Sequence, residues 1–233
     1  MKDLFGRAML DFYHGTNSED LLTETNISEE DVLPVSYLFR SYSEMPALEQ
    51  KALNLAGGNV LDLGCGAGSH SLYFQNKGQK VTALDISEGA IKVAQLRGVE
   101  TVMQKDVLQL TDQKFDTILL LMNGTGIFQK VDLVPDYLQH LKKLLNPDGQ
   151  ILIDSTDLKY MYNATEDGGI WVPGDRYYGE LDYLLKYKGE QSEWFPMLYL
   201  DPVLFERLCQ ENGLNFELIY TGENFEYLAR LTA

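Results

Sequence analysis

The chain has 233 residues and a formal net charge of −16, from 35 acidic and 19 basic residues. Nucleic-acid binding draws most of its affinity from Lys and Arg against phosphate, so this charge disfavours DNA or RNA as a partner. No apolar run reaches the length of about 18 residues that a membrane span requires, and the first residues lack a signal-peptide core. The two cysteines, Cys65 and Cys209, form no disulfide pattern, which favours a cytoplasmic protein.

The first 55 residues are predicted to form a helical extension. Apolar residues recur near the helical period over 1–14. Ser28-Glu-Glu-Asp31 is typical of a helix start, with serine as the cap and acids in the first turn. Pro46 favours the first position of a further helix.

Residues 60–68 read Val-Leu-Asp-Leu-Gly-Cys-Gly-Ala-Gly. The apolar start predicts a strand, and the glycines lead into a helix that begins near Ser69. Glycine lets the backbone approach a ligand without a Cβ in the way, and a helix N-terminus offers unpaired N–H groups. The stretch therefore predicts cofactor binding, although its G-x-G-x-G spacing differs from the G-x-G-x-x-G of dinucleotide-binding proteins.

With Asp62 two positions before the first glycine, this stretch resembles motif I of the class I S-adenosylmethionine (SAM) dependent methyltransferases. The resemblance implies an α/β, Rossmann-like fold with a seven-stranded, mostly parallel sheet in the order 3-2-1-4-5-7-6 and helices on both faces. It also implies SAM as the cofactor, with S-adenosylhomocysteine (SAH) as its product, and a first turn that holds the methionine part of SAM. The cofactor residues expected in this turn are Asp62, Gly64, Cys65, Gly66 and Gly68.

Two further acids follow predicted strands. Asp85 lies 21 positions after Gly64, close to the offset of about 20 expected for a carboxylate that binds ribose hydroxyls. With its neighbour Ile86 it is assigned to the cofactor; the alternative is a cap for the helix over 87–97. Asp106 matches the family position that accepts from the adenine amino group, and the N–H of Val107 is expected to reach the ring. The alternative for Asp106 is a solvated loop acid.

Residues 115–122 form the most apolar run of the chain and predict a central strand buried on both faces. Asn123-Gly-Thr-Gly126 follows at the carboxyl edge, where ligands bind in open α/β sheets. By the resemblance this is motif IV, beside the transferable methyl group, so Asn123 and Gly124 are expected to contact the cofactor. Family members that methylate amino groups of nucleic acids carry Asn or Asp-Pro-Pro-Tyr or Phe there, and this chain departs from that pattern.

In related enzymes an N-terminal extension lies across the mouth of the cofactor site. On that resemblance Arg40 is predicted to pair with the SAM carboxylate and Tyr13 to contact the cofactor; the alternative is a helix that merely covers the sheet. Tyr13 and His14 are candidates for a general base, but no residue is assigned a catalytic role.

Residues 156–200 fit no strand of the core sheet and carry both tryptophans. Tyr178–Lys188 and Glu193–Leu200 predict a β-hairpin. We interpret 156–200 as a cap inserted into a methyltransferase domain over 56–233, above the methyl-acceptor pocket. Its aromatic residues are expected to form an apolar wall or a cage for a cationic amine. Alternatively, the hairpin pairs with a second subunit in a homodimer.

These patterns predict a SAM-dependent methyltransferase that acts on a small-molecule acceptor, without a nucleic-acid or membrane partner. The three histidines stand alone in the sequence, so no metal site is expected. Two alternatives stay open: a non-catalytic protein that binds SAM or SAH, and an NAD-linked oxidoreductase, against which the glycine spacing and Asp62 count. The identity of the acceptor does not follow from the fold.

Overall fold

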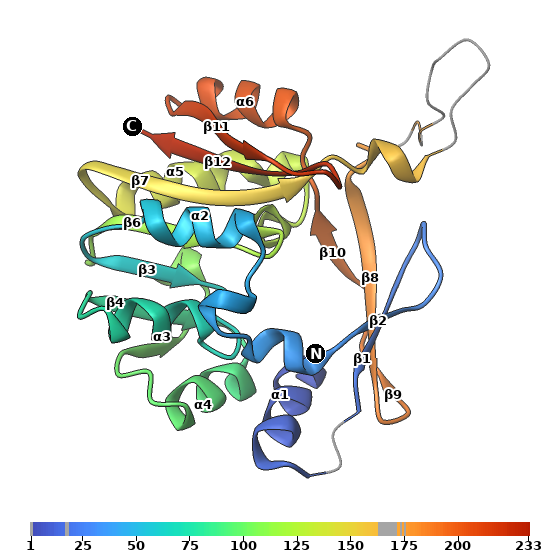
Figure 1. Ribbon diagram of the computed structural model, residues 1–233. Coiled ribbons are helices and arrows are strands. Elements are labelled where there is room, and N and C mark those ends of the chain that lie inside the picture. Colours follow the sequence, from blue (N-terminus) through green and yellow to red (C-terminus); the bar gives the residue numbers. More distant parts are fainter. Residues whose placement is uncertain (1, 17–18, 163–171, 173, 175) are drawn as a thin grey trace.

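The computed structural model describes residues 2–16, 19–162, 172, 174 and 176–233. Two sheets lie side by side in it (Figure 1). The larger sheet has seven strands in the order β11-β12-β7-β6-β3-β4-β5. Counted along the chain, this is the predicted order 3-2-1-4-5-7-6, which is confirmed. Its strands are β3 (Val60–Leu63), β4 (Val81–Asp85), β5 (Val102–Gln104), β6 (Phe115–Leu120), β7 (Leu145–Thr156), β11 (Asn215–Thr221) and β12 (Glu226–Thr232).

The five strands from β3 to β7 are parallel, whereas β12 runs antiparallel to both β7 and β11. The central strand β6 carries Ile118, Leu119 and Leu120, all fully buried. A strand of this kind has helices on both faces and needs no polar alternation. The carboxyl ends of β3, β4, β5 and β6 therefore meet at one edge of the sheet.

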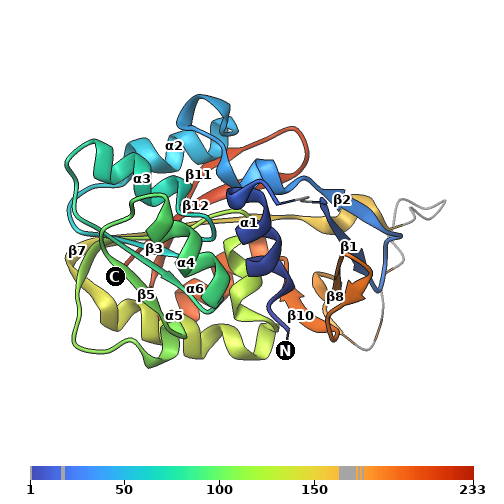
Figure 2. The ribbon, with the colours of Figure 1, turned by 90° about the horizontal axis from the view of Figure 1, so that it is seen from below.

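Helices cover both faces of the large sheet: α2 (Ala47–Leu55) and α3 (Ser69–Asn76) lie on one face, and α5 (Val134–Leu144) and α6 (Pro202–Glu211) on the other (Figure 2). α4 (Glu88–Leu96) follows β4 and begins at Ser87, whose hydroxyl accepts from the N–H of Ala90. Asp201 caps α6 in the same manner. Serine and aspartate at these positions satisfy N–H groups that have no partner within the helix.

The second sheet is antiparallel and combines segments that are far apart in the sequence. Its strand order is β10-β8-β1-β2, with β9 paired to β8. β8 and β10 come from the predicted hairpin, but the other neighbour of β8 is β1 of the same chain. The strands are β1 (Leu21–Thr25), β2 (Asp31–Leu33), β8 (Glu180–Tyr187), β9 (Glu190–Gln191) and β10 (Phe195–Leu198).

The N-terminal extension is thus not wholly helical, and the helix predicted to begin at Ser28 is wrong. Thr25 Oγ1 accepts from the N–H groups of Ile27 and Ser28 and bonds the Ser28 hydroxyl, which closes the turn between β1 and β2. Serine favours such turns for the same reason that it favours helix caps, because its short side chain bonds nearby backbone groups.

The helix α1 (Leu4–His14) joins the two sheets. Asp3 accepts from the N–H of Gly6 in α1 and from the N–H of Gly89 in α4, so one carboxylate caps both helices. On its other side, α1 binds the second sheet through the ion pair of Arg7 with Glu190. Short helical turns complete the fold: η1 (Val35–Phe39), η2 (Tyr42–Glu44), η3 (Val107–Gln109), η4 (Gly124–Phe128), η5 (Val131–Leu133) and η6 (Leu158–Met161). Among the described residues, no helix is long and apolar enough to cross a bilayer.

Candidate cofactor and acceptor site

The glycine turn after β3 has the conformation that its sequence predicts. Gly64, Gly66 and Gly68 have φ of 76°, 52° and 79°, a region that other residues rarely adopt. A β-carbon at Gly68 would lie 2.9 Å from Val99, so this glycine allows close packing of the turn on the α4 region. A β-carbon at Gly66 would have no atom within 4 Å. The turn therefore presents bare backbone to an open space, as a cofactor cradle requires.

Asp85 ends the neighbouring strand β4 and faces this turn. Its carboxylate accepts from the N–H of Gly66 and from the N–H of Ser87, each at 2.9 Å. Burial raises the pKa of Asp85, and the two amide bonds oppose that rise. The next side chain, Ile86, is 69% exposed. The strand end thus offers a fixed carboxylate beside an uncovered apolar surface.

Asp106 and Val107 lie at the end of the next strand, β5. The Asp106 side chain is exposed and caps η3 by accepting from the N–H of Leu108 at 2.9 Å. Val107 is buried in the core. Both roles predicted for Asp106 remain compatible with this geometry, since the cap uses one carboxylate oxygen.

The turn after β6 is strained. Met122 and Asn123 have φ of 67° and 61°, although neither is glycine. Backbone of this kind costs about 1–3 kcal/mol per residue and collects at functional sites. Asp154, near the end of β7, stabilises the turn: its two carboxylate oxygens accept from the N–H of Gly124 at 2.7 Å and of Asn123 at 3.1 Å. Burial raises the pKa of Asp154 to about 6.

Asp154 was missed by the sequence reasoning. It occupies the carboxyl end of an apolar strand, as Asp85 does, and this shared position is the signal that could have found it. No motif marks it, because its partners are backbone amides 30 and 31 residues away.

Asp62 is buried beneath the glycine turn. Its carboxylate accepts from the Ser71 hydroxyl at 2.6 Å and lies 3.9 Å from His70 Nδ1. Burial raises the pKa of Asp62, and His70 and Ser71 oppose the rise. Cys65, in the turn itself, is also buried. These two residues support the turn from below.

Arg40 is buried, and its guanidinium binds both carboxylate oxygens of Glu49. His70 shares that carboxylate through Nε2, at 2.7 Å. Burial alone would raise the pKa of Glu49, but the bonds to His70 and Arg40 outweigh it and lower the pKa. The Arg40 Nε atom is buried without a hydrogen-bond partner among the described residues.

Tyr13 lies at the far end of α4. Its hydroxyl donates to the carbonyl of Leu96 at 2.9 Å, near the helix C-terminus, whereas Asp85 lies before the N-terminus. Its predicted contact with the cofactor stays a prediction and gains no support from this position. His14 is the last residue of α1 and stacks edge-on against Tyr13.

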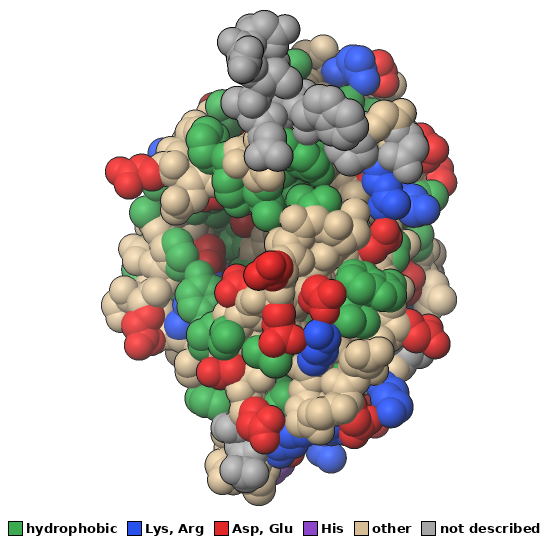
Figure 3. Space-filling view, turned by 90° about the vertical axis from the view of Figure 1, so that its right-hand side faces the viewer, with side chains coloured by type: hydrophobic (Ala, Val, Ile, Leu, Met, Phe, Trp, Pro, Cys, Tyr) green, Lys and Arg blue, Asp and Glu red, His purple; other side chains and the backbone are tan. Residues whose placement is uncertain are grey.

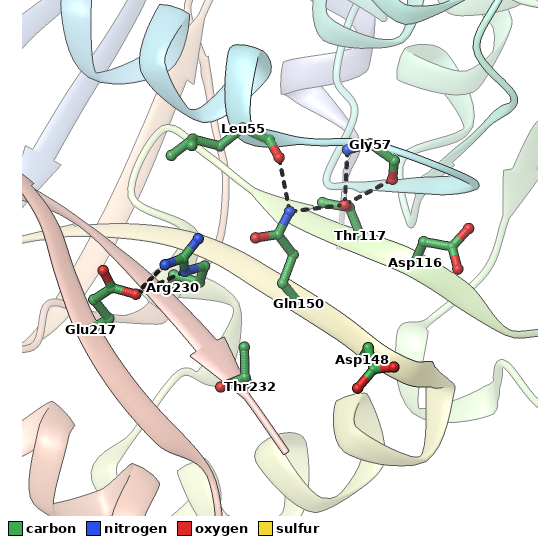
Figure 4. Close-up of a pocket in the computed structure, with 9 residues that line it drawn as sticks. All are labelled: Leu55, Gly57, Asp116, Thr117, Asp148, Gln150, Glu217, Arg230 and Thr232. Carbon is green, nitrogen blue, oxygen red and sulfur yellow. Dashed lines mark hydrogen bonds and ion pairs between the residues drawn. The ribbon is translucent and has the colours of Figure 1, made fainter.

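A depression lies at the opposite edge of the large sheet, where β6 and β7 begin (Figure 4). There Thr117 bonds the backbone of Gly57 and Gln150 bonds the carbonyl of Leu55, while Arg230 pairs with Glu217. These polar groups satisfy one another, and the parallel strands turn their amino ends to this side. Ligands of open α/β sheets bind at the carboxyl ends, so the glycine-turn edge is the candidate site. Among the described residues, no group of three or more His, Cys, Asp or Glu side chains could hold a metal ion.

Comparison with known proteins identifies the family of this chain. A methyltransferase-domain family model matches residues 60–149. The crystal structure of a SAM-dependent methyltransferase from Bacteroides fragilis in complex with SAH is 41% identical, covers 100% of this chain and 95% of its own, and has a TM-score of 0.92.

More distant proteins share less. The ubiquinone biosynthesis O-methyltransferase of Xanthomonas oryzae pv. oryzae is 34% identical over 114 residues, which cover 44% of this chain. This chain spans 45% of that relative's length. The sugar N-methyltransferase KedS8 of Streptoalloteichus is 14% identical, with a TM-score of 0.59 over 83% of this chain and 91% of its own, and shows the fold alone. On the full-length match to the Bacteroides protein, the chain belongs to the class I SAM-dependent methyltransferases.

Proposed function

We propose that this protein transfers a methyl group from SAM to a small-molecule acceptor bound between its two sheets. The observation that carries the proposal is the meeting, at one sheet edge, of an open glycine turn, a ribose-type carboxylate and a strained turn that faces the second sheet. The hydroxyl of Thr125 in that strained segment donates to the carbonyl of Leu198 in β10 at 3.0 Å, which joins the two regions.

This geometry supports the following roles for the proposed cofactor residues. Asp85 would bind the ribose hydroxyls, because its carboxylate keeps acceptor capacity beyond its two amide bonds. Gly64 and Gly66 would pass close to the methionine part of SAM, and Ile86 would cover the adenine ring. The remaining residues proposed for the cofactor site are Asp62, Cys65, Gly68, Asp106, Val107, Asn123 and Gly124.

Arg40 is the residue proposed to reach the donor carboxylate. Its pairing with Glu49 leaves one N–H, on Nε, buried without a partner, and buried donors of this kind are rarely left unsatisfied. A carboxylate of the bound cofactor would satisfy that donor.

When bound, SAM supplies an electrophilic methyl group on a positively charged sulfur. The chain has to hold donor and acceptor in reactive geometry and exclude water, and such positioning alone can lower a barrier by roughly 7–11 kcal/mol. Asn123 and Asp154 shape the edge at which the acceptor would lie. We place the reaction in the cytoplasm, because both cysteines are free and buried.

Calorimetric titration with SAM, SAH and NAD⁺ tests the cofactor assignment. We expect SAM and SAH to bind and NAD⁺ not to bind. Binding of NAD⁺ without SAH would overturn the proposal. Acceptors carrying oxygen form the second candidate class, because the Xanthomonas relative is named as an O-methyltransferase. A dimer formed through 156–200 is a separate proposal, which sedimentation analysis tests.

A further inference from the structure

The space between the two sheets contains a carboxylate that the cofactor assignment does not use. Asp154 is 8% exposed, and among the described residues its hydrogen-bond partners are the amides of Asn123 and Gly124. These amides fix the orientation of the carboxylate beside the strained turn. Two amide bonds leave acceptor capacity on the carboxylate, which has about four lone-pair positions.

The segment that carries Tyr199 is bonded to the region around this carboxylate: the carbonyl of Leu198 accepts from Asn123 and Thr125, and the N–H of Leu200 donates to Ser155, the residue after Asp154. Tyr183 of β8 and Tyr199, just after β10, are joined through their hydroxyls at 2.5 Å. Burial raises the pKa of Tyr199, and Tyr183 and Asp154 raise it further. Burial also raises the pKa of Tyr37 in η1; Arg40, which lies 3.9 Å from the centre of the Tyr37 ring, opposes that rise, and Glu49 and Asp154 add to it. Tyr37 and Tyr199 therefore lie within electrostatic reach of Asp154, and Tyr183 joins this group through its bond to Tyr199.

Each of these tyrosines is partly accessible to solvent. Tyr37 is 38% exposed, and Tyr183 and Tyr199 are each partly exposed. The face of the molecule that carries the second sheet is hollowed, with hydrophobic side chains in the walls and acidic ones inside and along the rim (Figure 3).

The nearby cations offset the charge of Asp154 only in part: His70 opposes the rise in its pKa, and Arg40 lies over the Tyr37 ring. Arg40 and His70 both bind Glu49, so their charge is directed to that carboxylate. An anionic acceptor would be repelled by Asp154, and a neutral one would leave its charge uncompensated. An ammonium group would bind the carboxylate and phenol oxygens and lie against aromatic rings, an arrangement that stabilises cations.

We infer that the methyl acceptor is an amine, which binds as its ammonium ion between Asp154 and the phenol groups of Tyr37, Tyr183 and Tyr199. The inference rests on the proposed function and names its substrate class. Before transfer, the ammonium releases one proton to solvent and regains its lone pair. That pair forms the new N–C bond, and the S–C bond breaks with its electrons left on sulfur, so the positive charge passes from sulfur to nitrogen and the products are the methylated ammonium ion and SAH.

The test is calorimetric titration of the SAH-saturated protein at pH 8 with three probes of one shape: benzylamine, benzyl alcohol and benzoate. We expect benzylamine to bind at least about tenfold more tightly than the other two. Equal binding of the three, preference for the alcohol or benzoate, or no binding of any would overturn the inference. SAH affinity is measured first, so its loss would count against the proposed function, and retained SAH binding without amine preference would count against the inference alone.

Variants locate the binding groups. Tyr199→Phe keeps the ring and removes the hydroxyl, and we expect benzylamine affinity to fall about threefold to tenfold with SAH affinity unchanged. Asp154→Asn should remove the preference for amine over alcohol. Tyr42→Phe is the matched control, because the Tyr42 hydroxyl bonds Asn54 and its ring stacks on Tyr73. A loss in Tyr42→Phe as large as in Tyr199→Phe would contradict the location.

Discussion

The carboxyl edge of the large sheet and the antiparallel second sheet are built in different ways. At the carboxyl edge, short local signals decide the structure: glycines within five positions shape the turn, and Asp85 directly ends β4. In the second sheet, β1 pairs with β8 across more than 150 residues, Leu22 opposite Lys186. The carboxyl edge, where the methyl donor would bind, is the donor side, and local sequence specifies it. The region of the second sheet, where the acceptor would bind, is the acceptor side, and it depends on contacts between distant segments.

The largest effect should come from the buried ion pair of Glu49 with Arg40, which His70 of α3 joins. Glu49→Gln removes the charge that Arg40 and His70 share, and breaking a buried ion pair costs about 3–5 kcal/mol. Urea unfolding measures this loss. Glu190→Gln is the control, since its pairs with Lys2 and Arg7 are accessible to solvent and should contribute much less to stability. Similar losses of unfolding free energy in both variants would contradict a special role for the buried ion pair of Glu49.

Gly66→Val breaks the donor side alone. The side chain would fill the open space above the turn, and we expect SAH affinity to fall at least about 100-fold while the protein stays folded. Gly78→Val controls for backbone strain, because Gly78 also has positive φ and open surroundings but lies after α3. Calorimetry and thermal unfolding separate the two effects; unchanged SAH affinity in Gly66→Val would show that the turn is not the site.

Asp85→Ala should weaken SAM binding by about 1–3 kcal/mol, because bonds from the ribose hydroxyls to a charged acceptor are lost. Asp116→Ala is the matched control: its carboxylate accepts from the N–H of Asn59 in the depression at the opposite edge. If Asp116→Ala weakened binding and Asp85→Ala did not, the cofactor site would lie at the opposite edge of the sheet.

The smallest effect is a pH dependence on the acceptor side. Burial raises the pKa of Asp154 to about 6; Glu49 adds to the rise, and His70 and the amides of Asn123 and Gly124 oppose it. Asp154 is charged above that pH and neutral below it, so benzylamine affinity should fall as pH drops through about 6, by at most about tenfold per unit. Calorimetry from pH 8 to 5 measures it, with benzyl alcohol as the control that should not change.

The same contrast explains what sequence reasoning could reach. The glycine turn was predictable, because glycine spacing is a local property, and the strand order followed from the family resemblance that this turn carries. The strands β1 and β2 were predicted as helical, because Ser28 satisfies both a cap pattern and the turn that it forms with Thr25. Asp154 was not predictable as part of the acceptor side, since its partners lie in the turn after β6, and Tyr37 in η1 and Tyr199 after β10 come close to it only through folding.

Hydrogen exchange of backbone amides with and without SAH tests most directly which edge of the sheet carries the site. We predict protection at residues 62–70, 85–88 and 106–108 and at the turn 122–125, with no change around Gly57, Asp116 and Asp148. Protection confined to the depression at the opposite edge, with the glycine turn unchanged, would contradict the account.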